Sequence, residues 1–309
     1  MKKCMGCMSD IRDDMSTCTS CGYSKEQAHR EISLYPDRLP VETILGERYI
    51  LGRLLSATDY SLLYLAWDAL LERKVVIREY FPAMFSFRDE SSPDVRFYDS
   101  DSEGKFEQGR KAFEADAQKL FLLQSLEVIP DYYRVIRANN TSYTVMEYLE
   151  GITLEDYIGS GKKAPGWTDE KIMEMAGKAL ELVHTKGVLH LNLSPDNLYL
   201  CENDRLCLID YGSAKAEVYR EADCEPELFR EEVIAPELLE GKSGERASDL
   251  YSLGCIRYYL MTGNPPLRKN LRSLKGIQDK KSPQAQRIKA LTRMKPENRN
   301  TGFMGNEGQ

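Results

Sequence analysis

The stretch from Val188 to Gly212 constrains the fold of this chain more than any other part of it. Its sequence is VLHLNLSPDNLYLCENDRLCLIDYG, in which turn signals rich in Asp and Asn separate two apolar runs. Three polar side chains stand at set offsets in it, namely Asn192, Asn197 and Asp210. Polar residues at fixed offsets between apolar runs are typical of catalytic motifs, so this stretch is the candidate catalytic motif of the chain.

This stretch resembles the catalytic loop and metal loop of protein kinases, whose pattern is H-R-D-L-x-x-x-N followed by D-F-G. His190 stands at the His, Asn197 at the Asn, and the sequence from Asp210 to Gly212 at D-F-G. Leu191 replaces the Arg, and Asn192 replaces the Asp that accepts the proton of the substrate hydroxyl. An amide is no base near neutral pH, so the resemblance predicts a kinase fold together with impaired catalysis.

Length and composition fit one such domain and a small addition. The chain has 309 residues, of which 42% are hydrophobic and 29% charged, as in an ordinary globular protein. It contains no apolar run near the roughly 18 residues that a membrane helix needs, and no signal-peptide pattern. We therefore expect a cytoplasmic protein without a membrane partner.

Four cysteines near the N-terminus have the spacing of a metal site, Cys4-x2-Cys7 and Cys18-x2-Cys21. Four thiolates close a tetrahedral site, so residues 1–24 predict a zinc ribbon with a structural zinc ion. Metal binding would supply most of the folding free energy of so short a segment. The alternative is four unligated thiols on a disordered tail. Acidic residues offset the bases of the ribbon, so it lacks the charge that nucleic-acid binding needs. The other four cysteines are predicted to be buried small hydrophobes: Cys201, Cys207, Cys224 and Cys255.

The region from Thr43 to Pro82 has the alternation and β-branched residues of three strands. It resembles the opening of the small lobe in bacterial kinases that carry an N-terminal zinc ribbon and the phrase V-A-I-K-E-Y-F-P. With the ribbon, the resemblance runs from about Cys4 to Arg299. It implies an α+β, two-lobed kinase-like fold, with a small β-rich lobe plus one helix and a larger helical lobe. The expected domains are a ribbon (1–24), a linker (25–42), a kinase-like domain (43–301, lobes about 43–148 and 149–301) and a disordered tail (302–309).

The Gly-rich loop of that family, G-x-G-x-x-G-x-V, falls on Ser56, Thr58, Ser61 and Leu63, so all three glycines are absent. A Cβ at each position obstructs the approach of backbone N–H groups to phosphates, which predicts weak phosphate binding.

The family's Lys–Glu ion pair is also altered. Its Lys falls on Arg78, and its Glu falls on Asp116 in a helix expected from Glu103 to about Leu126. A longer base and a shorter acid could still span the same gap as a structural pair. Alternatively, both are solvated surface charges.

By the resemblance, Met146 is the gatekeeper, and Glu147 and Leu149 belong to the hinge that meets adenine. The walls of the slot hold Leu63, Val76 and Tyr199, each at least as large as its usual counterpart, so one interpretation is that the protein itself fills part of the slot. Alternatively, Tyr199 stacks on adenine. The implied cofactor is ATP with Mg²⁺, and the implied nucleotide-binding positions are Leu55, Leu63, Val76, Arg78, Asp116, Met146, Glu147, Leu149 and Tyr199.

The scaffold motifs of the large lobe are intact. Ala235-Pro236-Glu237 matches A-P-E, Asp249 matches the Asp that anchors the catalytic loop, and Arg299 matches the Arg that pairs with the A-P-E Glu. The activation segment lies between the D-F-G and A-P-E positions, at residues 213–234. Its only hydroxyl side chains are Ser213 and Tyr219, so control by phosphorylation of this segment is not expected.

Charge is unevenly spread along this lobe. Residues 217–240 hold nine acids, and residues 268–295 hold ten bases against Asp279 alone. The two blocks are either solvated faces or complementary docking surfaces for a protein partner or a second copy.

Three functions are compatible with these features. The first is a pseudokinase that regulates or scaffolds bacterial signalling, because the Gly-rich loop, the Lys and the catalytic Asp are all replaced. The second is a weakly active, ATP-dependent serine/threonine kinase, because Asn197 and Asp210 survive as metal ligands. The third is a nucleic-acid adaptor built on the ribbon, which its balanced charge disfavours.

Overall fold

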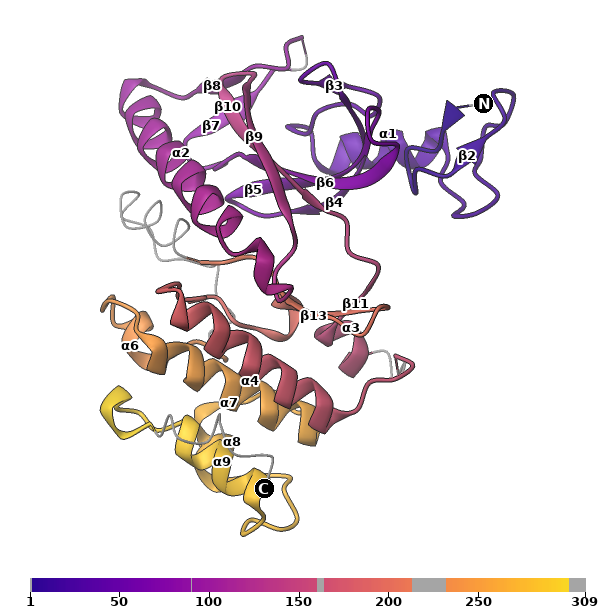
Figure 1. Ribbon diagram of the computed structural model, residues 1–309. Coiled ribbons are helices and arrows are strands. Elements are labelled where there is room, and N and C mark those ends of the chain that lie inside the picture. Colours follow the sequence, from indigo (N-terminus) through magenta and orange to yellow (C-terminus); the bar gives the residue numbers. More distant parts are fainter. Residues whose placement is uncertain (1, 90, 160–163, 213–231, 300–309) are drawn as a thin grey trace. The chain divides into compact units, whose positions relative to one another are not determined.

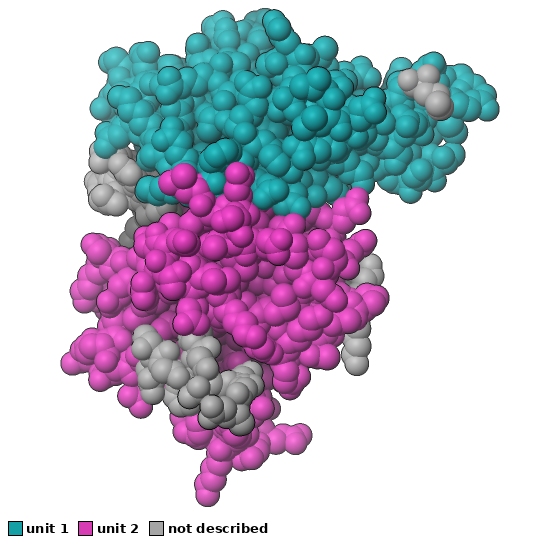
Figure 2. Space-filling model, viewed as in Figure 1, with its two compact units in different colours: residues 1–121, 131–148, 214–224 teal, residues 122–130, 149–213, 225–309 magenta. Residues whose placement is uncertain are grey.

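A computed structural model describes residues 2–89, 91–159, 164–212 and 232–299 of the chain. The chain forms two compact units, drawn in different colours in Figure 2. Unit 1 comprises residues 1–121, 131–148 and 214–224, and unit 2 comprises residues 122–130, 149–213 and 225–309. Unit 1 is rich in strands and unit 2 in helices, which confirms the expected two-lobed α+β architecture.

An antiparallel sheet of six strands, in the order β3-β4-β5-β6-β10-β9, is the centre of unit 1 (Figure 1). The three strands expected before residue 82 are β4, β5 and β6, and the short β3 pairs with the start of β4. Asn139 and Asn140 make the turn between β9 and β10 with φ of 52° and 56°, a conformation that Asn tolerates better than most residues. The bounds are β3 Ile44–Leu45, β4 Tyr49–Ala57, β5 Ser61–Asp68, β6 Arg73–Tyr80, β9 Tyr132–Ala138 and β10 Thr141–Glu147.

Helix α2, Ser100–Phe121, lies along one face of this sheet (Figure 1). Its Phe106 and Phe113 are buried and pack against Tyr80 of β6, with ring centroids 4.8 and 5.6 Å away. The helix ends before the predicted Leu126, because the chain turns there into the 3-10 helix η1, Gln124–Leu126. Two further short strands, β7 Ser86–Arg88 and β8 Val95–Phe97, pair with each other.

The predicted linker is wrong for its first part, since Lys25–Leu34 forms helix α1. Ser24 and Gln27 explain this start, because each side chain bonds to the backbone N–H of the other in a capping box. Beyond the helix, Leu39 is fully buried and Asp37 accepts a hydrogen bond from the backbone N–H of Arg88 at 2.9 Å. The segment is therefore packed against unit 1, and the ribbon, with strands β1 Lys2–Lys3 and β2 Asp10–Ile11, belongs to the same unit.

Unit 2 combines a three-stranded sheet, in the order β11-β12-β13, with helices of very different length. Helix α4 spans Asp169–Thr185, with Thr168 as its N-cap. The remaining bounds are β11 Gly151–Thr153, α3 Leu154–Gly159, η2 Pro195–Asn197, β12 Leu198–Cys201, β13 Leu206–Leu208, α6 Pro236–Leu239, α7 Arg246–Thr262, α8 Arg268–Ser273, α9 Pro283–Leu291 and η3 Pro296–Asn298.

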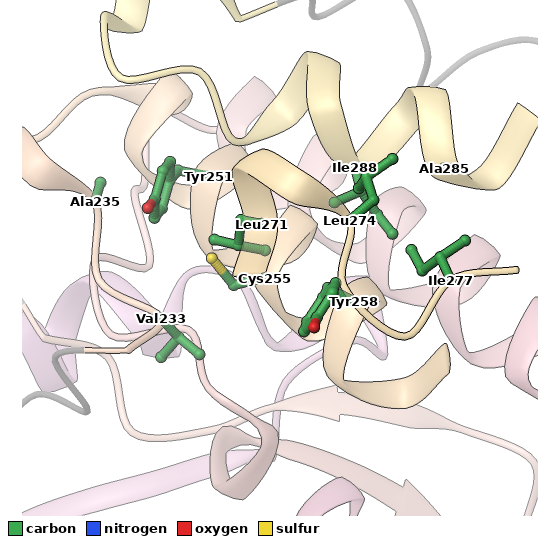
Figure 3. Packing of buried hydrophobic residues seen from close by; sticks show 10 residues of the cluster. All are labelled: Val233, Ala235, Tyr251, Cys255, Tyr258, Leu271, Leu274, Ile277, Ala285 and Ile288. Atoms are coloured by element: carbon green, nitrogen blue, oxygen red, sulfur yellow. The ribbon is translucent and has the colours of Figure 1, made fainter. Parts of the chain in front are cut away.

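Helix α7 is the centre of unit 2, and the residues from Ser248 to Ile256 are all buried. Figure 3 shows Tyr251, Cys255 and Tyr258 of α7 packed with Leu271 of α8 and Ile288 of α9. Cys201, Cys207 and Cys255 are buried as predicted. Cys224, Ser213, Tyr219 and the predicted tail 302–309 lie outside the described residues. Within the described ranges, no helix is both long and apolar enough to cross a membrane.

Candidate functional site

The stretch from Val188 to Gly212, called the catalytic-loop stretch below, is fixed to α7 by one buried carboxylate. Asp249 is 1% exposed and accepts hydrogen bonds from the backbone N–H of His190 at 2.9 Å and of Leu191 at 2.7 Å. It also bonds to Nε2 of His184 at 2.8 Å, which gives this buried histidine a structural role. The predicted anchor is thus confirmed, and it holds Leu191 with a φ of 56°.

Leu191, which stands where the kinase pattern has Arg, makes an apolar contact. Its Cδ2 lies so near Gly244 that a Cβ on that glycine would be only 2.4 Å away. A side chain at position 244 would therefore force the end of the Leu191 side chain to move. An arginine at position 191 would present a cation in place of this packing contact.

The three polar residues of the stretch form one hydrogen-bonded group. Nδ2 of Asn192 donates to the backbone oxygen and to Oδ2 of Asp210, both at 2.9 Å, and Nδ2 of Asn197 donates to the backbone oxygen of Asn192 at 2.7 Å. Asp210 has a φ of 58°, a conformation that this bonding supports. Asn192 therefore acts here as a hydrogen-bond donor to a carboxylate, a role that an ionised Asp cannot take.

His190 is a buried neutral imidazole in this arrangement. Burial lowers the pKa of His190 below its ordinary value, against the opposing effect of Asp249. Its Nε2 lies 3.1 Å from the backbone oxygen of Ile209, and its Nδ1 is 3.3 Å from the backbone N–H of Asn192. These contacts assign the proton to Nε2, and the ring packs on Tyr211 with centroids 4.3 Å apart.

Tyr199, a predicted wall of the adenine slot, is fixed by the backbone of its own unit. Its hydroxyl donates to the backbone oxygen of Gly151 at 3.0 Å and lies 3.4 Å from that of Leu149. Tyr199 pairs with Cys207 across β12 and β13, which leaves its ring half-buried. The position of this ring is thus set by contacts within unit 2.

In unit 1 the hairpin between β4 and β5 stands in place of the Gly-rich loop. Oγ1 of Thr58 accepts hydrogen bonds from the backbone N–H groups of Tyr60 at 3.3 Å and Ser61 at 3.1 Å. The backbone oxygen of Tyr60 accepts from Phe81 at 3.0 Å, and that of Asp59 from Ala83 at 3.0 Å. Two donors of the hairpin are thus used by a side chain, and the hairpin is tied to the segment after β6.

Arg78, at the position of the kinase Lys, faces the same hairpin. Its Nε donates to Oγ of Ser61 at 3.2 Å, and its guanidinium lies 5.5 Å from the ring of Tyr60 and 6.0 Å from that of Phe113. Asp116 follows Phe113 by one turn of α2 and bonds to Lys119 at 3.2 Å. The pair between Arg78 and Asp116 stays a prediction.

The remaining nucleotide-binding positions are divided between the units. In unit 1, Val76 and Met146 are 8% and 9% exposed, whereas Leu55 and Leu63 are half-buried. Glu147 exchanges hydrogen bonds with Asp131, through its backbone N–H at 2.8 Å and through Oε2 at 3.1 Å. Leu149 begins the next part of unit 2. Their roles toward a nucleotide remain predictions.

The four N-terminal cysteines come together as their spacing predicts. The sulfur atoms of Cys4, Cys7, Cys18 and Cys21 lie within 4.8 Å of one another, close enough to hold a metal ion. Burial raises the pKa of the Cys4 thiol, against the opposing effect of the hydrogen bond that the backbone N–H of Gly6 donates to its Sγ at 3.3 Å. The donor set and its closeness therefore fit a soft divalent ion.

The sequence did not indicate that this cysteine cluster is attached to the sheet. The backbone N–H of Arg53 in β4 donates to the backbone oxygen of Met5 at 2.7 Å, so the ribbon pairs with the outer side of that strand. A Cβ on Gly52 would lie 2.4 Å from the same oxygen and 2.3 Å from Cε of Met8, so only glycine permits this approach. One turn of backbone between Cys4 and Cys7 thus connects the metal site with β4.

The buried ion pairs among the described residues include one pair in each unit that sequence reasoning can be compared with. Arg299 forms two hydrogen bonds with Glu237, at 2.6 and 2.7 Å, as predicted from the A-P-E motif. Sequence reasoning missed the other pair, in which Glu79 of β6 bonds to Arg88 and to the hydroxyl of Tyr143 at 2.7 Å. No sequence signal identified Arg88 as the partner, since the contact depends on how β7 packs.

Comparisons with a family model, with curated proteins and with solved structures are in agreement with one another. The model of the protein kinase domain family matches residues 100–302. Serine/threonine-protein kinase PknB of Mycobacterium leprae is 27% identical over 72% of this chain and 33% of its own length, and PknB of Mycolicibacterium smegmatis is 29% identical over the same shares. The chain thus spans about a third of the length of these relatives. A solved structure, "PpkA-294 apo form", is similar with a TM-score of 0.71 and 22% identity, over 87% of this chain and 98% of that one.

Proposed function

Because the chain belongs to the protein kinase domain family, we propose that it is a pseudokinase that regulates or scaffolds bacterial signalling with little or no phosphoryl transfer. The observation that carries the proposal is the bond from Asn192 to Asp210 at 2.9 Å. The residue that should accept a proton is here a donor to the neighbouring carboxylate. Loss of a positioned base reduces the rate of catalysis by roughly 10²–10⁴.

The phosphate-binding elements support the same proposal. In a kinase, the backbone N–H groups of the Gly-rich loop are directed toward the phosphates. In this chain Thr58 accepts from two such groups, and Ser61 accepts from Arg78, so the hairpin and the cation bind each other. The backbone N–H groups of Tyr60 and Ser61 would have to leave Thr58 before they could contact a phosphate.

The competing proposal is a weakly active, ATP-dependent serine/threonine kinase. Asn197 and Asp210 survive, and phosphoryl transfer depends largely on positioning and on charge neutralisation by metal ions. In such a protein, ATP with Mg²⁺ would be held by these two residues, and Arg78 would neutralise phosphate charge in place of Lys.

The cysteine cluster is assigned to zinc with a structural role. Four thiolates leave no open position for a substrate, and the bond between Arg53 and Met5 gives the ribbon a place in the architecture of unit 1. A protein partner or a second copy is the expected partner class. A cytoplasmic location stays a prediction from the sequence.

The deciding experiment compares the zinc-loaded chain with its Asp210→Ala variant. Phosphoryl transfer from radiolabelled ATP to the chain itself and to a generic protein substrate is followed for hours, with Mg²⁺ or Mn²⁺. The pseudokinase proposal expects equal counts for both proteins, because Asp210 then has no catalytic role. Transfer that exceeds the variant by tenfold or more would establish the weakly active kinase.

Thermal unfolding with ATP then distinguishes binding from catalysis. A ligand at about one hundred times its dissociation constant stabilises a protein by roughly 2.7 kcal/mol. A shift that requires the metal ion and disappears in Asp210→Ala would show that a nucleotide–metal complex still binds. No shift in either protein is the outcome expected if the hairpin, Arg78 and Tyr199 keep the contacts described above.

A further inference from the structure

A small cavity in unit 2 is surrounded by cations. It has a volume of about 190 Å³ and lies where α7, α8 and α9 meet. Arg268 and Arg272 of α8, Lys289 of α9 and Arg293 just after α9 line it. This cavity lies among helices that follow the catalytic-loop stretch in the chain, and none of the residues that line it belongs to that stretch.

The base of the cavity is rigid. Two of the residues that line it, Tyr251 and Leu271, are 1% and 3% exposed and belong to the hydrophobic cluster in Figure 3. In that cluster they pack with Ala285 and Ile288 of α9. The backbones that carry the four cations are therefore fixed against one another by a packed core, which limits the entropy lost when a ligand binds.

Within the described part of the chain, these four cations have no carboxylate partner. No acid in residues 2–89, 91–159, 164–212 and 232–299 forms an ion pair with any of the four. Arg293 donates a hydrogen bond to the backbone oxygen of Asn298 at 3.0 Å. The whole segment 268–295 holds ten bases against Asp279. Like charges gathered around one cavity repel one another, and a bound anion would relieve that repulsion.

We propose that this cavity binds the phosphoryl group of a phosphorylated serine or threonine in an acidic polypeptide. This names the partner class of the scaffold, and in that sense it rests on the proposed function. Arginine guanidinium groups present paired donors that match phosphate oxygens, and three of the four cations are arginines. The apolar Leu271 and Met294 beside them suit the carbon atoms of a side chain.

Size and charge favour this ligand over other anions. A cavity of about 190 Å³ has room for about six water volumes and is smaller than the roughly 300–1,000 Å³ of sites that enclose a whole cofactor or nucleotide. A nucleic acid needs an extended basic stripe, whereas this chain carries a net charge of −7. A phosphoryl group is small and carries about −1.5 to −2 charges near pH 7.

The test uses the zinc-loaded full chain and a fluorescent peptide rich in Glu that carries one phosphothreonine. Matched peptides have Thr or Glu at that position, and inorganic phosphate serves as competitor. We expect the phosphopeptide to bind about tenfold tighter than either matched peptide, because it adds charge-assisted hydrogen bonds. Inorganic phosphate should compete, with a weaker affinity than the phosphopeptide.

Two double variants locate the binding. Arg272→Gln/Lys289→Gln removes two cations that line the cavity, whereas Lys280→Gln/Lys281→Gln removes the same charge from the same basic segment outside it. We expect the first to weaken binding by about tenfold or more and the second by less than about threefold. Thermal unfolding confirms that both variants fold.

Four results would overturn the inference: no binding, equal binding of the three peptides, equal losses in the two double variants, or phosphate as tight as the phosphopeptide. The last would mean a site for the free anion. The transfer assay with Asp210→Ala is a separate test. Transfer well above that of the variant would refute the pseudokinase proposal and would leave this binding site unaffected. If the chain neither binds the phosphopeptide nor transfers phosphoryl groups from ATP, only the proposed binding site is refuted.

Discussion

Replacing Asn192 by Asp restores the kinase pattern in the sequence, and we predict that it destabilises unit 2 without restoring activity. In the structure Nδ2 of Asn192 donates to the backbone oxygen and to Oδ2 of Asp210, both at 2.9 Å. The new carboxylate loses both donor contacts and places a second negative charge beside Asp210. We expect no phosphoryl transfer from this variant, because the hairpin at Thr58 and Arg78 remain as they are.

The magnitude follows from two terms. A hydrogen bond to a charged group contributes about 1.5–3 kcal/mol. Two charges about 4 Å apart repel by about 4 kcal/mol at an effective dielectric constant of 20, and the half-buried setting of both residues reduces this through solvent screening. We therefore expect a loss of about 2–4 kcal/mol in the free energy of unfolding at pH 7.

Urea unfolding of matched variants separates the terms. Asn192→Ala loses the hydrogen bonds without gaining a charge, so the difference between it and Asn192→Asp measures the repulsion. The exchanged variant Asn192→Asp/Asp210→Asn again pairs an amide with a carboxylate and should recover most of the stability. Near pH 4 one carboxylate of Asn192→Asp becomes protonated and the deficit should shrink.

Two results would refute this reasoning. The first is an Asn192→Asp protein as stable as the wild type at pH 7 without metal, since the bond between Asn192 and Asp210 would then contribute nothing. The second is an exchanged variant no more stable than Asn192→Asp. Robust phosphoryl transfer by Asn192→Asp alone would separately refute the claim that the phosphate-binding elements are lost.

Three further predictions concern the scaffold and the ribbon. Arg299→Ala leaves Glu237 buried and unpaired and should lower stability by about 3–5 kcal/mol in urea unfolding, whereas an unchanged midpoint would show that the pair is dispensable. Zinc chelation, Cys7→Ser and Gly52→Ala should each accelerate amide hydrogen exchange at Arg53, since all three disturb the contact with Met5; unchanged exchange in the chelated protein would argue against the coupling. Burial lowers the pKa of His190. Hydrogen bonds from Arg299 and Ser248 lower the pKa of Glu237, against the opposing effect of burial. Each group therefore stabilises the folded state fully only above the pKa that it has in the unfolded chain. Stability should thus decline below about pH 6.5 through His190 and further below about pH 4.5 through Glu237, and His190→Gln should flatten the first decline in urea midpoints measured from pH 7 to 5.

Several features of this protein could be predicted from local sequence because their signals are local. Hydrophobic alternation placed β4, β5 and β6. The two Cys-x2-Cys pairs predicted the cluster, because each pair needs only one turn of backbone to bring its sulfur atoms together. Asp249 and Arg299 were predicted through motif positions, and their partners were then found in place.

Helix α1 shows how a local signal can be missed. Prolines at 36 and 40 and the weak periodicity favoured a linker, yet the capping box of Ser24 and Gln27 was already present in the sequence. A cap of this kind lowers the free energy of a short helix, and packing of the following segment on unit 1 completes it.

Other features depend on residues distant in sequence, so that only the tertiary structure decided them. The sequence by itself determined that Asn192 cannot be a base, that the glycines of the phosphate loop are absent, and that segment 268–295 is basic. Only the fold brings Asn192 to Asp210, the guanidinium of Arg78 to the Thr58 hairpin, and Met5 to β4. It also brings four cations, from α8, α9 and the residues just after α9, to one cavity over a packed core. The physical reason is that residue type fixes what a side chain can donate or accept, whereas its partner depends on packing between elements.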